Sequence, residues 1–380
     1  MANSATNSAK NPMVIGIPKE IKNNENRVSL VPSGVKALKA HGHTVLVQTN
    51  AGVGIGISDD DYRKAGATIV ETAKEVFAKS EMIIKVKEPL PEEYPLLREN
   101  QILYTYLHLA PAPQLTKALL ERKIIGIAYE TIQLSDGSLP LLNPMSEVAG
   151  RMATQIGANL LQKDSGGRGI LLGGVPGVER ANVTILGGGV SGANAAKIAI
   201  GMGAKVTISD INQKRLEYLD HIFGASVFTL YSNVDNIEKS VRESDLVIGA
   251  VLVPGAKAPK LVSKDLVSQM NPGSVVVDIA VDQGGCIETC KPTSHDNPTF
   301  TVEGVIHYCV PNMPGAVART STYALTNVTL EYALKLADLG FKNAIAKDPA
   351  LYKGVNVYNG KVAYLQVAKD LGLPYEEVRF

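Results

Sequence analysis

The stretch between residues 182 and 210 constrains the fold more than any other part of the chain. It starts with a short apolar run typical of a β-strand, continues through a glycine-rich turn and small apolar residues at helical spacing, and ends with a second β-run. An acid, Asp210, closes it about twenty residues beyond the glycines. Strand, turn, helix, strand and acid in this order are the context that a dinucleotide-binding βαβ unit requires. The glycines of its G-x-G-x-x-G turn are Gly187, Gly189 and Gly192.

Each glycine has a separate physical role in such a turn. Gly187 permits the tight turn, Gly189 lets the backbone approach a pyrophosphate, and Gly192 lets helix and strand pack closely. The helix N-terminus offers unpaired N–H groups to phosphates. Asp210 can accept hydrogen bonds from a ribose diol and would repel a 2′-phosphate, which favours NAD over NADP; Arg215, nearby, weakens that preference. An ordinary βαβ turn in a doubly wound sheet is the alternative.

Length and composition limit the class of protein. A chain of 380 residues predicts two domains, at about 150 residues per domain. Its 45% hydrophobic and 20% charged content is typical of a soluble globular protein. The net charge is +1 and no basic block occurs, so nothing indicates nucleic acid or a membrane surface as partner. No apolar run reaches the roughly 20 residues needed to span a bilayer.

The N-terminus and the cysteines point to a cytoplasmic protein. Residues 1–12 are small and polar, lack the apolar run of a signal peptide, and are expected to form a disordered extension. Cys286, Cys290 and Cys309 are too few for a disulfide framework, and they lack the paired C-x-x-C spacing of a zinc site. We therefore expect reduced thiols and no metal site.

Strand and helix signals alternate along the chain, which predicts parallel βαβ units. The fold class we expect is α/β, with two Rossmann-like doubly wound domains and the active site in the cleft between them. A long helix over residues 144–163, capped by Ser146, precedes the fingerprint, and the chain is expected to be helical from about 320 to 380. The predicted strands are 13–18, 43–48, 82–86, 102–109, 124–129, 226–230, 246–251, 274–279 and 299–302, with early helices at 33–40 (capped by Ser33) and 114–122.

Candidate chemical groups follow the predicted strands of the first half, where open α/β sheets bind ligands. Arg27 could bind a carboxylate bidentately, although a solvated arginine is commoner. Lys85 and Lys87 would share a strand face; Lys87, at the strand's end, could hold a carboxylate or polarise a carbonyl, or else be a solvated lysine. His108 could exchange protons near neutral pH, or be a core histidine.

The second half offers a similar set. The strand is apolar until Asp278, and Asp282 follows at its carboxyl edge. A carboxylate at that edge would face the nicotinamide region of the cleft, or merely cap a turn. Asn312 and Met313 lie in a loop bracketed by prolines, which could cover a nicotinamide ring or be an ordinary crossover.

From about residue 13 nearly to its C-terminus, the chain resembles the alanine dehydrogenase family. The matching stretches are GIPKEIKNNENRVSL, IKVKEPL, LHLA, MSEVAGRMA, GGVPGV, LGGGVSGANAA, DLVIGAVLVPGAKAPKLV, VVVDIAVDQGGC and TSTYALTN. The resemblance implies reversible, NAD-dependent oxidative deamination of L-alanine to pyruvate and ammonium by a cytoplasmic homohexamer. It also implies a catalytic domain of residues 1–140 and 319–380 and an NAD-binding domain of residues 141–318.

The resemblance further implies roles for individual residues. Arg27 and Lys87 would bind substrate, His108 would donate or accept protons, and Asp282 would be the second acid–base group. Besides the three glycines, the residues implied to contact NAD are Ser146, Val190, Ser191, Asp210, Arg215, Ser232, Val251, Leu252, Ile279, Ala280, Val281, Asp282, Lys291, Val310, Pro311, Asn312 and Met313.

Other functions stay open at this stage. The NAD-binding subunit of a proton-pumping transhydrogenase resembles the same family, but needs a membrane partner. Saccharopine-forming dehydrogenases are more distant relatives and need a larger, acidic substrate site. A non-enzymatic nucleotide-binding protein could keep the fold as well, because fold does not determine function. The joint presence of Arg27, Lys87, His108 and Asp282 argues against that last class.

Overall fold

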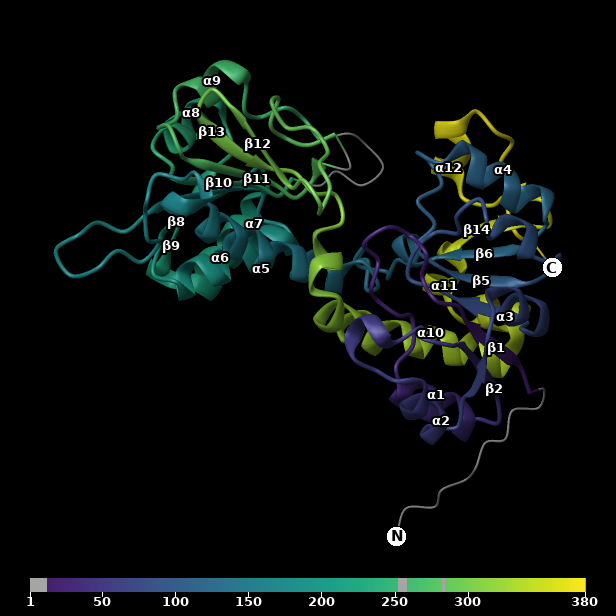
Figure 1. Ribbon diagram of the computed structural model, residues 1–380. Coiled ribbons are helices and arrows are strands. Elements are labelled where there is room, and N and C mark those ends of the chain that lie inside the picture. Colours follow the sequence, from purple (N-terminus) through teal and green to yellow (C-terminus); the bar gives the residue numbers. More distant parts are fainter. Residues whose placement is uncertain (1–11, 252–257, 282–283, 380) are drawn as a thin grey trace, which may run out of the picture. The chain divides into compact units, whose positions relative to one another are not determined.

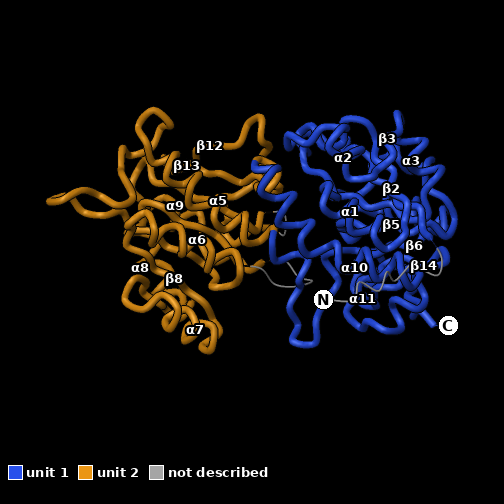
Figure 2. The backbone as a smooth tube through the Cα atoms, turned by 90° about the horizontal axis from the view of Figure 1, so that it is seen from below, with its two compact units in different colours: residues 1–144, 317–380 blue, residues 145–316 orange. Residues whose placement is uncertain are grey.

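The structure is a computed structural model that describes residues 12–251, 258–281 and 284–379. The predicted disordered extension, apart from Pro12, and two predicted site residues, Leu252 and Asp282, lie outside the described residues. The chain divides into two compact units, coloured separately in Figure 2. Unit 1 comprises Met1–Pro144 and Val317–Phe380, and unit 2 comprises Met145–Ala316.

Unit 1 is built on one sheet, which has eight strands among the described residues, in the order β15-β14-β6-β5-β4-β1-β2-β3. Figure 1 labels β14, β6, β5, β1 and β2 among them. The strands β1 to β6 run parallel. The chain adds β2 and β3 on one side of β1 and then returns to add β4, β5 and β6 on the other. The strands are β1 Val14–Ile17, β2 Thr44–Gln48, β3 Thr68–Val70, β4 Met82–Ile84, β5 Ile102–Thr105, β6 Ile125–Ala128, β14 Val355–Tyr358 and β15 Lys361–Val362.

Helices pack apolar faces against this sheet, and Val76, Phe77, Leu103 and Leu119 are among the buried side chains of its core. α10 contains a break at Gly340, whose φ of 70° is left-handed. The α-helices of unit 1 are α1 Pro32–Ala40, α2 Asp59–Lys64, α3 Ala73–Lys79, α4 Pro113–Glu121, α10 Ala318–Lys347, α11 Pro349–Lys353 and α12 Leu365–Leu371, and its 3₁₀ turns are η1 Val53–Ile55, η2 Tyr94–Leu96 and η3 Tyr129–Thr131.

The prediction of a wholly helical C-terminal region is wrong. After α10 and α11 the chain forms β14, which pairs antiparallel with β6, and β15, which pairs antiparallel with β14. Asn359 and Gly360 connect these two strands with φ values of 49° and 74°. Two consecutive left-handed residues are typical of a tight hairpin turn, for which Asn-Gly is the preferred dipeptide.

Unit 2 is also a doubly wound sheet, with seven strands among its described residues, in the order β12-β13-β11-β10-β7-β8-β9. All of its pairings are parallel except that of the outer strand β12 with β13. The chain adds β8 and β9 on one side of β7 and then β10, β11 and β13 on the other. The strands are β7 Asn182–Leu186, β8 Lys205–Asp210, β9 Val227–Tyr231, β10 Leu246–Gly249, β11 Val275–Asp278, β12 Thr299–Val302 and β13 Val305–Tyr308.

The central strands of unit 2 are fully buried, as strands with helices on both faces must be. Buried Val247, Val267, Val276 and Val305 belong to one core cluster on this sheet. The helices are α5 Asn143–Leu160, α6 Val190–Gly201, α7 Gln213–Phe223, α8 Val234–Arg242 and α9 Lys264–Ser268, with 3₁₀ turns η4 Lys163–Ser165, η5 Gly224–Ser226 and η7 Met313–Val317.

The predicted fold class, two Rossmann-like α/β domains, is confirmed, but several local details differ. α1 begins at Pro32 and has Val31 as N-cap, so Ser33 is not the cap, because proline is favoured at the first helical position. α5 begins at Asn143, which places Ser146 inside the first turn rather than at the cap. Both β4 and β5 end earlier than predicted, so that Lys85, Lys87 and His108 follow their strands instead of lying on them.

No helix in the described part of the chain combines the length and the apolar character that a membrane span requires.

We predict that Gly360→Ala destabilises unit 1 by about 1 kcal/mol, because a Cβ is strained at this positive φ. The midpoint of thermal unfolding should fall by roughly 2–4 °C. Gly201→Ala is the control, since Gly201 lies at the end of α6 without a positive φ and with open space where a Cβ would lie. An equal loss of stability in both variants would contradict the turn assignment.

Candidate active site

The glycine-rich turn lies where the strand order of unit 2 reverses. β7 precedes the turn, and β8 and β10 flank β7 on its two sides. In open α/β sheets the crevice at the carboxyl ends of two such strands is the ligand-binding position. The turn comes very close to β10 there: a Cβ on Gly187, which has a φ of 99°, would lie 2.8 Å from the Ala250 carbonyl oxygen. Glycine is therefore required at position 187 for steric reasons.

The other two glycines fit their expected roles. A Cβ on Gly192 would lie 1.8 Å from the Gly187 carbonyl oxygen, so any side chain would push α6 away from the turn. A Cβ on Gly189 would meet nothing within 4 Å. Gly189 is the N-cap of α6 and supplies no side-chain cap. The open side of the turn and the uncapped helix N-terminus together suit the pyrophosphate of a dinucleotide.

Asp210 and Arg215 are both tied to this turn. Asp210 Oδ2 accepts a hydrogen bond from the Gly188 amide at 2.8 Å, and Oδ1 accepts one from the Asn212 amide at 2.8 Å. Arg215 Nε donates to the Gly188 carbonyl oxygen, and its guanidinium lies 4.7 Å from the centre of the Tyr218 ring. The acid is thus fixed at the end of β8, beside the glycine turn.

Most other predicted cofactor contacts follow the carboxyl ends of the same parallel strands. Ser232 follows β9, and Val251 follows β10. The helix α5 also approaches the turn closely, since a Cβ on Gly150 would lie 2.1 Å from the Ser191 carbonyl oxygen. Ser146 is one helical turn before Gly150. Val190, Ser191, Ile279, Ala280, Val281, Val310, Pro311, Asn312 and Met313 follow β7, β11 or β13. Lys291 instead contacts Phe300 of the outer strand β12.

Asp278 is a structural anchor and not an exposed acid. Its carboxylate is fully buried and accepts hydrogen bonds from the amides of Ala280 at 3.0 Å, Cys286 at 3.0 Å and Ile287 at 3.3 Å. Burial raises the pKa of Asp278, and these amides oppose that effect. The turn-capping alternative is therefore correct for Asp278, which joins Ala280 to Cys286 and Ile287.

The predicted substrate residues of unit 1 also lie at a reversal of strand order. Arg27 follows β1 and Lys87 follows β4, and these two strands are the pair at which the order reverses. Arg27 is buried and pairs bidentately with Glu25, through Nε to Oε1 at 2.7 Å and Nη2 to Oε2 at 2.6 Å. Although burial favours their neutral forms, this pair raises the pKa of Arg27 and lowers that of Glu25. The Glu25 carboxylate thus fixes the plane of the guanidinium.

Lys85 and Lys87 have different environments although they are only two residues apart. Lys85 is completely buried between Glu93, at 2.7 Å, and Glu20, at 3.2 Å. Lys87 is half-buried, and burial together with the nearby charges of Arg27 and Lys22 lowers its pKa, against the effect of Glu88. Lys87 is therefore the better candidate to receive an anion, because a bound carboxylate would offset the repulsion from Arg27.

His108 follows β5 with a left-handed φ of 47°. Its amide donates to Glu130 Oε1 at 2.7 Å, and the Leu107 amide donates to the same carboxylate at 3.2 Å. The imidazole stacks on Tyr106, with the ring centres 5.8 Å apart. Burial raises the pKa of Tyr106, which keeps that phenol neutral beside the histidine. Arg27, Lys87 and His108 thus all follow strands that end at one edge of the unit 1 sheet.

Comparisons with known proteins identify the family of this chain. The model of the alanine dehydrogenase/PNT N-terminal domain matches residues 16–149, and that of the alanine dehydrogenase/PNT C-terminal domain matches residues 153–365. The chain belongs to the alanine dehydrogenase/PNT family. It is 64% identical to an alanine dehydrogenase of Methanococcus maripaludis, over 96% of this chain and 98% of that protein.

Solved structures of relatives show the same fold. A structure of an L-alanine dehydrogenase is 56% identical, with a TM-score of 0.92 over 95% of this chain and 99% of that one. A structure of transhydrogenase from Sinorhizobium meliloti has a TM-score of 0.79 over 93% of this chain and 99% of that one, at 24% identity. At that identity the second likeness concerns the fold alone.

Several members of this site were missed by reasoning from the sequence. Four glutamates bond to a candidate residue or to the backbone next to one, and these are Glu20, Glu25, Glu93 and Glu130. Glu20 and Glu25 lie in the polar segment after the first strand, so a search for acids able to pair with Arg27 or a buried lysine could have found them. Glu93, only 8 residues after Lys85, could have been found in the same way. Glu130 gave no such signal, because its partner His108 lies 22 residues before it.

We predict that Lys87 loses its proton below the ordinary lysine pKa of 10.5. Arg27→Met should raise the pKa of Lys87, because it removes a nearby positive charge and leaves the Glu25 carboxylate without its guanidinium. NMR of ¹³C-methylated lysines, with the Lys87 signal assigned by its loss in Lys87→Arg, measures both values. Arg63→Met, in an exposed pair with Asp60, is the control and should change nothing. An unaltered Lys87 pKa in Arg27→Met would contradict the electrostatic link.

Proposed function

We propose that this protein is an NAD-dependent L-alanine dehydrogenase. It converts L-alanine, water and NAD⁺ into pyruvate, ammonium, NADH and a proton, and it catalyses the reverse reaction. The observation that carries the proposal is the pair of sites at the two strand-order reversals. One site presents a glycine turn and an acid suited to a dinucleotide. The other presents Arg27 and Lys87, which suit a small carboxylate, and His108, which can exchange protons with the substrate. The family and the alanine dehydrogenases at 56–64% identity support this choice.

The residues of unit 2 favour NAD as the dinucleotide. The Asp210 carboxylate is fixed next to the turn, where it can accept hydrogen bonds from a ribose diol and would repel a 2′-phosphate. The Arg215 guanidinium, which could otherwise attract that phosphate, is bonded to the carbonyl oxygens of Gly188 and Gly189. When bound, NAD⁺ accepts the hydride that leaves the Cα of alanine.

The residues of unit 1 would bind and orient the substrate. Arg27, held in plane by Glu25, and Lys87 bind the carboxylate, and Lys87 also reaches the keto oxygen of pyruvate. Loss of the hydride leaves an imine, to which water adds before ammonia departs. His108 transfers protons during these steps, and Asp282 is the second acid–base group. The cell compartment and the assembly that we propose, cytoplasm and homohexamer, follow from the family resemblance.

The transhydrogenase subunit remains the nearer alternative, and a non-enzymatic nucleotide-binding protein the other. The assay that decides among the three is the absorbance of NADH during incubation with NAD and L-alanine, glycine, L-serine or L-lysine. A rise with L-alanine well above the others, and a fall with pyruvate, NADH and ammonium, supports the proposal. Absence of signal with every amino acid, together with measurable NAD binding, would favour one of the alternatives.

We predict that His108→Ala lowers kcat by about 10²–10⁴-fold, the usual contribution of a positioned acid–base group. NAD affinity should stay within about twofold, since His108 lies in unit 1 and the glycine turn in unit 2. His41→Ala is the matched control, because His41 pairs with Asp338 before β2, at the opposite edge of the sheet. Wild-type turnover in His108→Ala would refute the role.

We predict that Asp210→Ala weakens NAD binding by about tenfold, because a hydrogen bond to a charged group is lost. The discrimination against NADP should also fall, because the carboxylate no longer repels the 2′-phosphate. Titration calorimetry with each dinucleotide measures both effects. Asp235→Ala, which removes an acid from the first turn of α8, serves as control. Unchanged affinity for both dinucleotides in Asp210→Ala would exclude the assigned role.

A further inference from the structure

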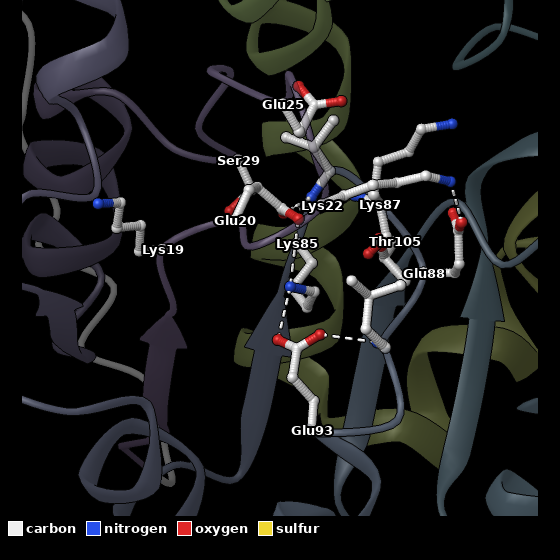
Figure 3. Close-up of polar contacts among 12 residues, drawn as sticks. Lys19, Glu20, Lys22, Glu25, Ser29, Lys85, Lys87, Glu88, Glu93 and Thr105 are labelled. Atoms are coloured by element: carbon white, nitrogen blue, oxygen red, sulfur yellow. Dashed lines mark hydrogen bonds and ion pairs between the residues drawn. The ribbon is translucent and has the colours of Figure 1, made fainter. Parts of the chain in front are cut away.

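The mechanism above leaves one group of buried charges in unit 1 unused. Lys85 has no exposed side-chain surface, and the side chains of Glu20 and Glu93 are each 3% exposed. Figure 3 shows the Lys85 ammonium beside the Glu93 carboxylate, with Glu20 on the side toward Lys87. Burial lowers the pKa of an ammonium, but here the two acids raise the pKa of Lys85, so it stays charged. We call Glu20, Lys85 and Glu93 the buried triad.

The buried triad is connected directly to the backbone that carries Lys87. Glu20 Oε1 accepts hydrogen bonds from the amides of Val86, at 2.6 Å, and Lys87, at a longer 3.4 Å. Its other oxygen, Oε2, faces Lys85 Nζ. Glu20 thus joins the segment after β1 to the segment after β4, the two segments that supply Arg27 and Lys87.

The same segment is held at further points. Lys85 donates its amide to the Tyr104 carbonyl oxygen at 3.1 Å, and Glu93 Oε2 accepts from the Leu90 amide at 2.9 Å. Thr105 Oγ1 donates to the Lys87 carbonyl oxygen at 3.0 Å (Figure 3). Both peptide groups of Lys87 are therefore bonded to side chains from other segments, which fixes where its Cα lies and where its side chain starts.

Net stability does not account well for such a group. Removing three charges from water has a large free-energy cost, and replacing a buried ion pair by apolar residues of similar volume is often neutral or stabilising. What a buried, fully bonded carboxylate provides is a defined geometry, since each of its oxygens has a fixed partner. A lysine or arginine that contacts substrate needs placement within about 0.5 Å to be productive.

We propose that the buried triad of Glu20, Lys85 and Glu93 positions Lys87 for the substrate carboxylate. The inference rests on the proposed function, in which Lys87 binds alanine or pyruvate. Glu20 is the positioning residue in direct contact with the Lys87 segment, and Glu93 acts through Lys85 and Leu90. None of the three touches substrate. The triad therefore determines the affinity for the carboxylate and leaves that for the dinucleotide unaltered.

The test uses Glu20→Gln and Glu93→Gln in the full-length enzyme. An amide has one acceptor oxygen, so Gln at position 20 loses its contact with either Val86 or Lys85, whichever way it is turned. We expect the KM for pyruvate to rise about tenfold in Glu20→Gln and less in Glu93→Gln, with the KM for NADH within about twofold of wild type. Hydrogen exchange of the segment 85–90 should accelerate in both variants.

The matched control is Asp338→Asn, which also replaces a carboxylate that bridges two partners, His41 and His43, each at 2.9 Å. Both histidines precede β2 and so lie at the amino ends of the parallel strands, whereas Lys87 lies at their carboxyl ends. Asp338→Asn should lower thermal stability but change neither the pyruvate KM nor the exchange of residues 85–90. Glu93→Gln decides the matter if Glu20→Gln does not fold.

The outcomes separate this inference from the proposed function. An active wild type whose pyruvate KM is unchanged in the triad variants overturns the positioning role and leaves the function intact. A wild type that does not oxidise NADH with pyruvate and ammonium overturns the function itself. A pyruvate KM that rises equally in Asp338→Asn, or an unaltered exchange of residues 85–90 in the triad variants, also overturns the positioning role.

Discussion

The reversal of strand order is the constraint on which both halves of this molecule depend. In a parallel sheet all strands end at one edge, and where the chain changes the side to which it adds strands, the two following segments diverge and leave a crevice. In unit 1 the reversal lies between β1 and β4, and in unit 2 between β7 and β10. Arg27 and Lys87 follow the first pair, and the glycine turn follows β7 in the second. The topology of each sheet thus selects which residues meet.

Buried charge gives the unit 1 edge its chemical character. Arg27 and Lys85 are buried cations with acids bonded to them, and those acids raise the pKa of each. Lys87 differs, because burial and its positive neighbours lower its pKa. An anion bound at Lys87 would stabilise its charged form against burial and against the charges of Arg27 and Lys22. This is the physical basis for our proposal that the substrate carboxylate binds there. The pairs around Arg27 and Lys85 keep the other charges in fixed places.

Much of this could be predicted from the sequence, for local reasons. The βαβ alternation, the glycine turn and the polar residues just after apolar runs are all local patterns. They singled out Arg27, Lys87, His108 and Asp210 as candidates, and their roles stay predictions. The different roles of Lys85 and Lys87 could not be predicted, because no local pattern shows that Lys85 is buried between Glu93 and Glu20 while Lys87 is not. The hairpin of β14 and β15 was missed although Asn359-Gly360 is a strong turn signal. Its pairing with β6, more than 200 residues earlier, has no local signature.

The central claim is that the dinucleotide and the carboxylate are bound by separate sets of residues, one in each unit. Steady-state kinetics of NADH oxidation by Lys87→Met, with pyruvate and ammonium, test it most directly. We expect the KM for pyruvate to rise at least about tenfold, since a charged contact to the carboxylate is lost, and the KM for NADH to stay unchanged. A pyruvate KM equal to that of the wild type, or an equal rise in both constants, would contradict the account.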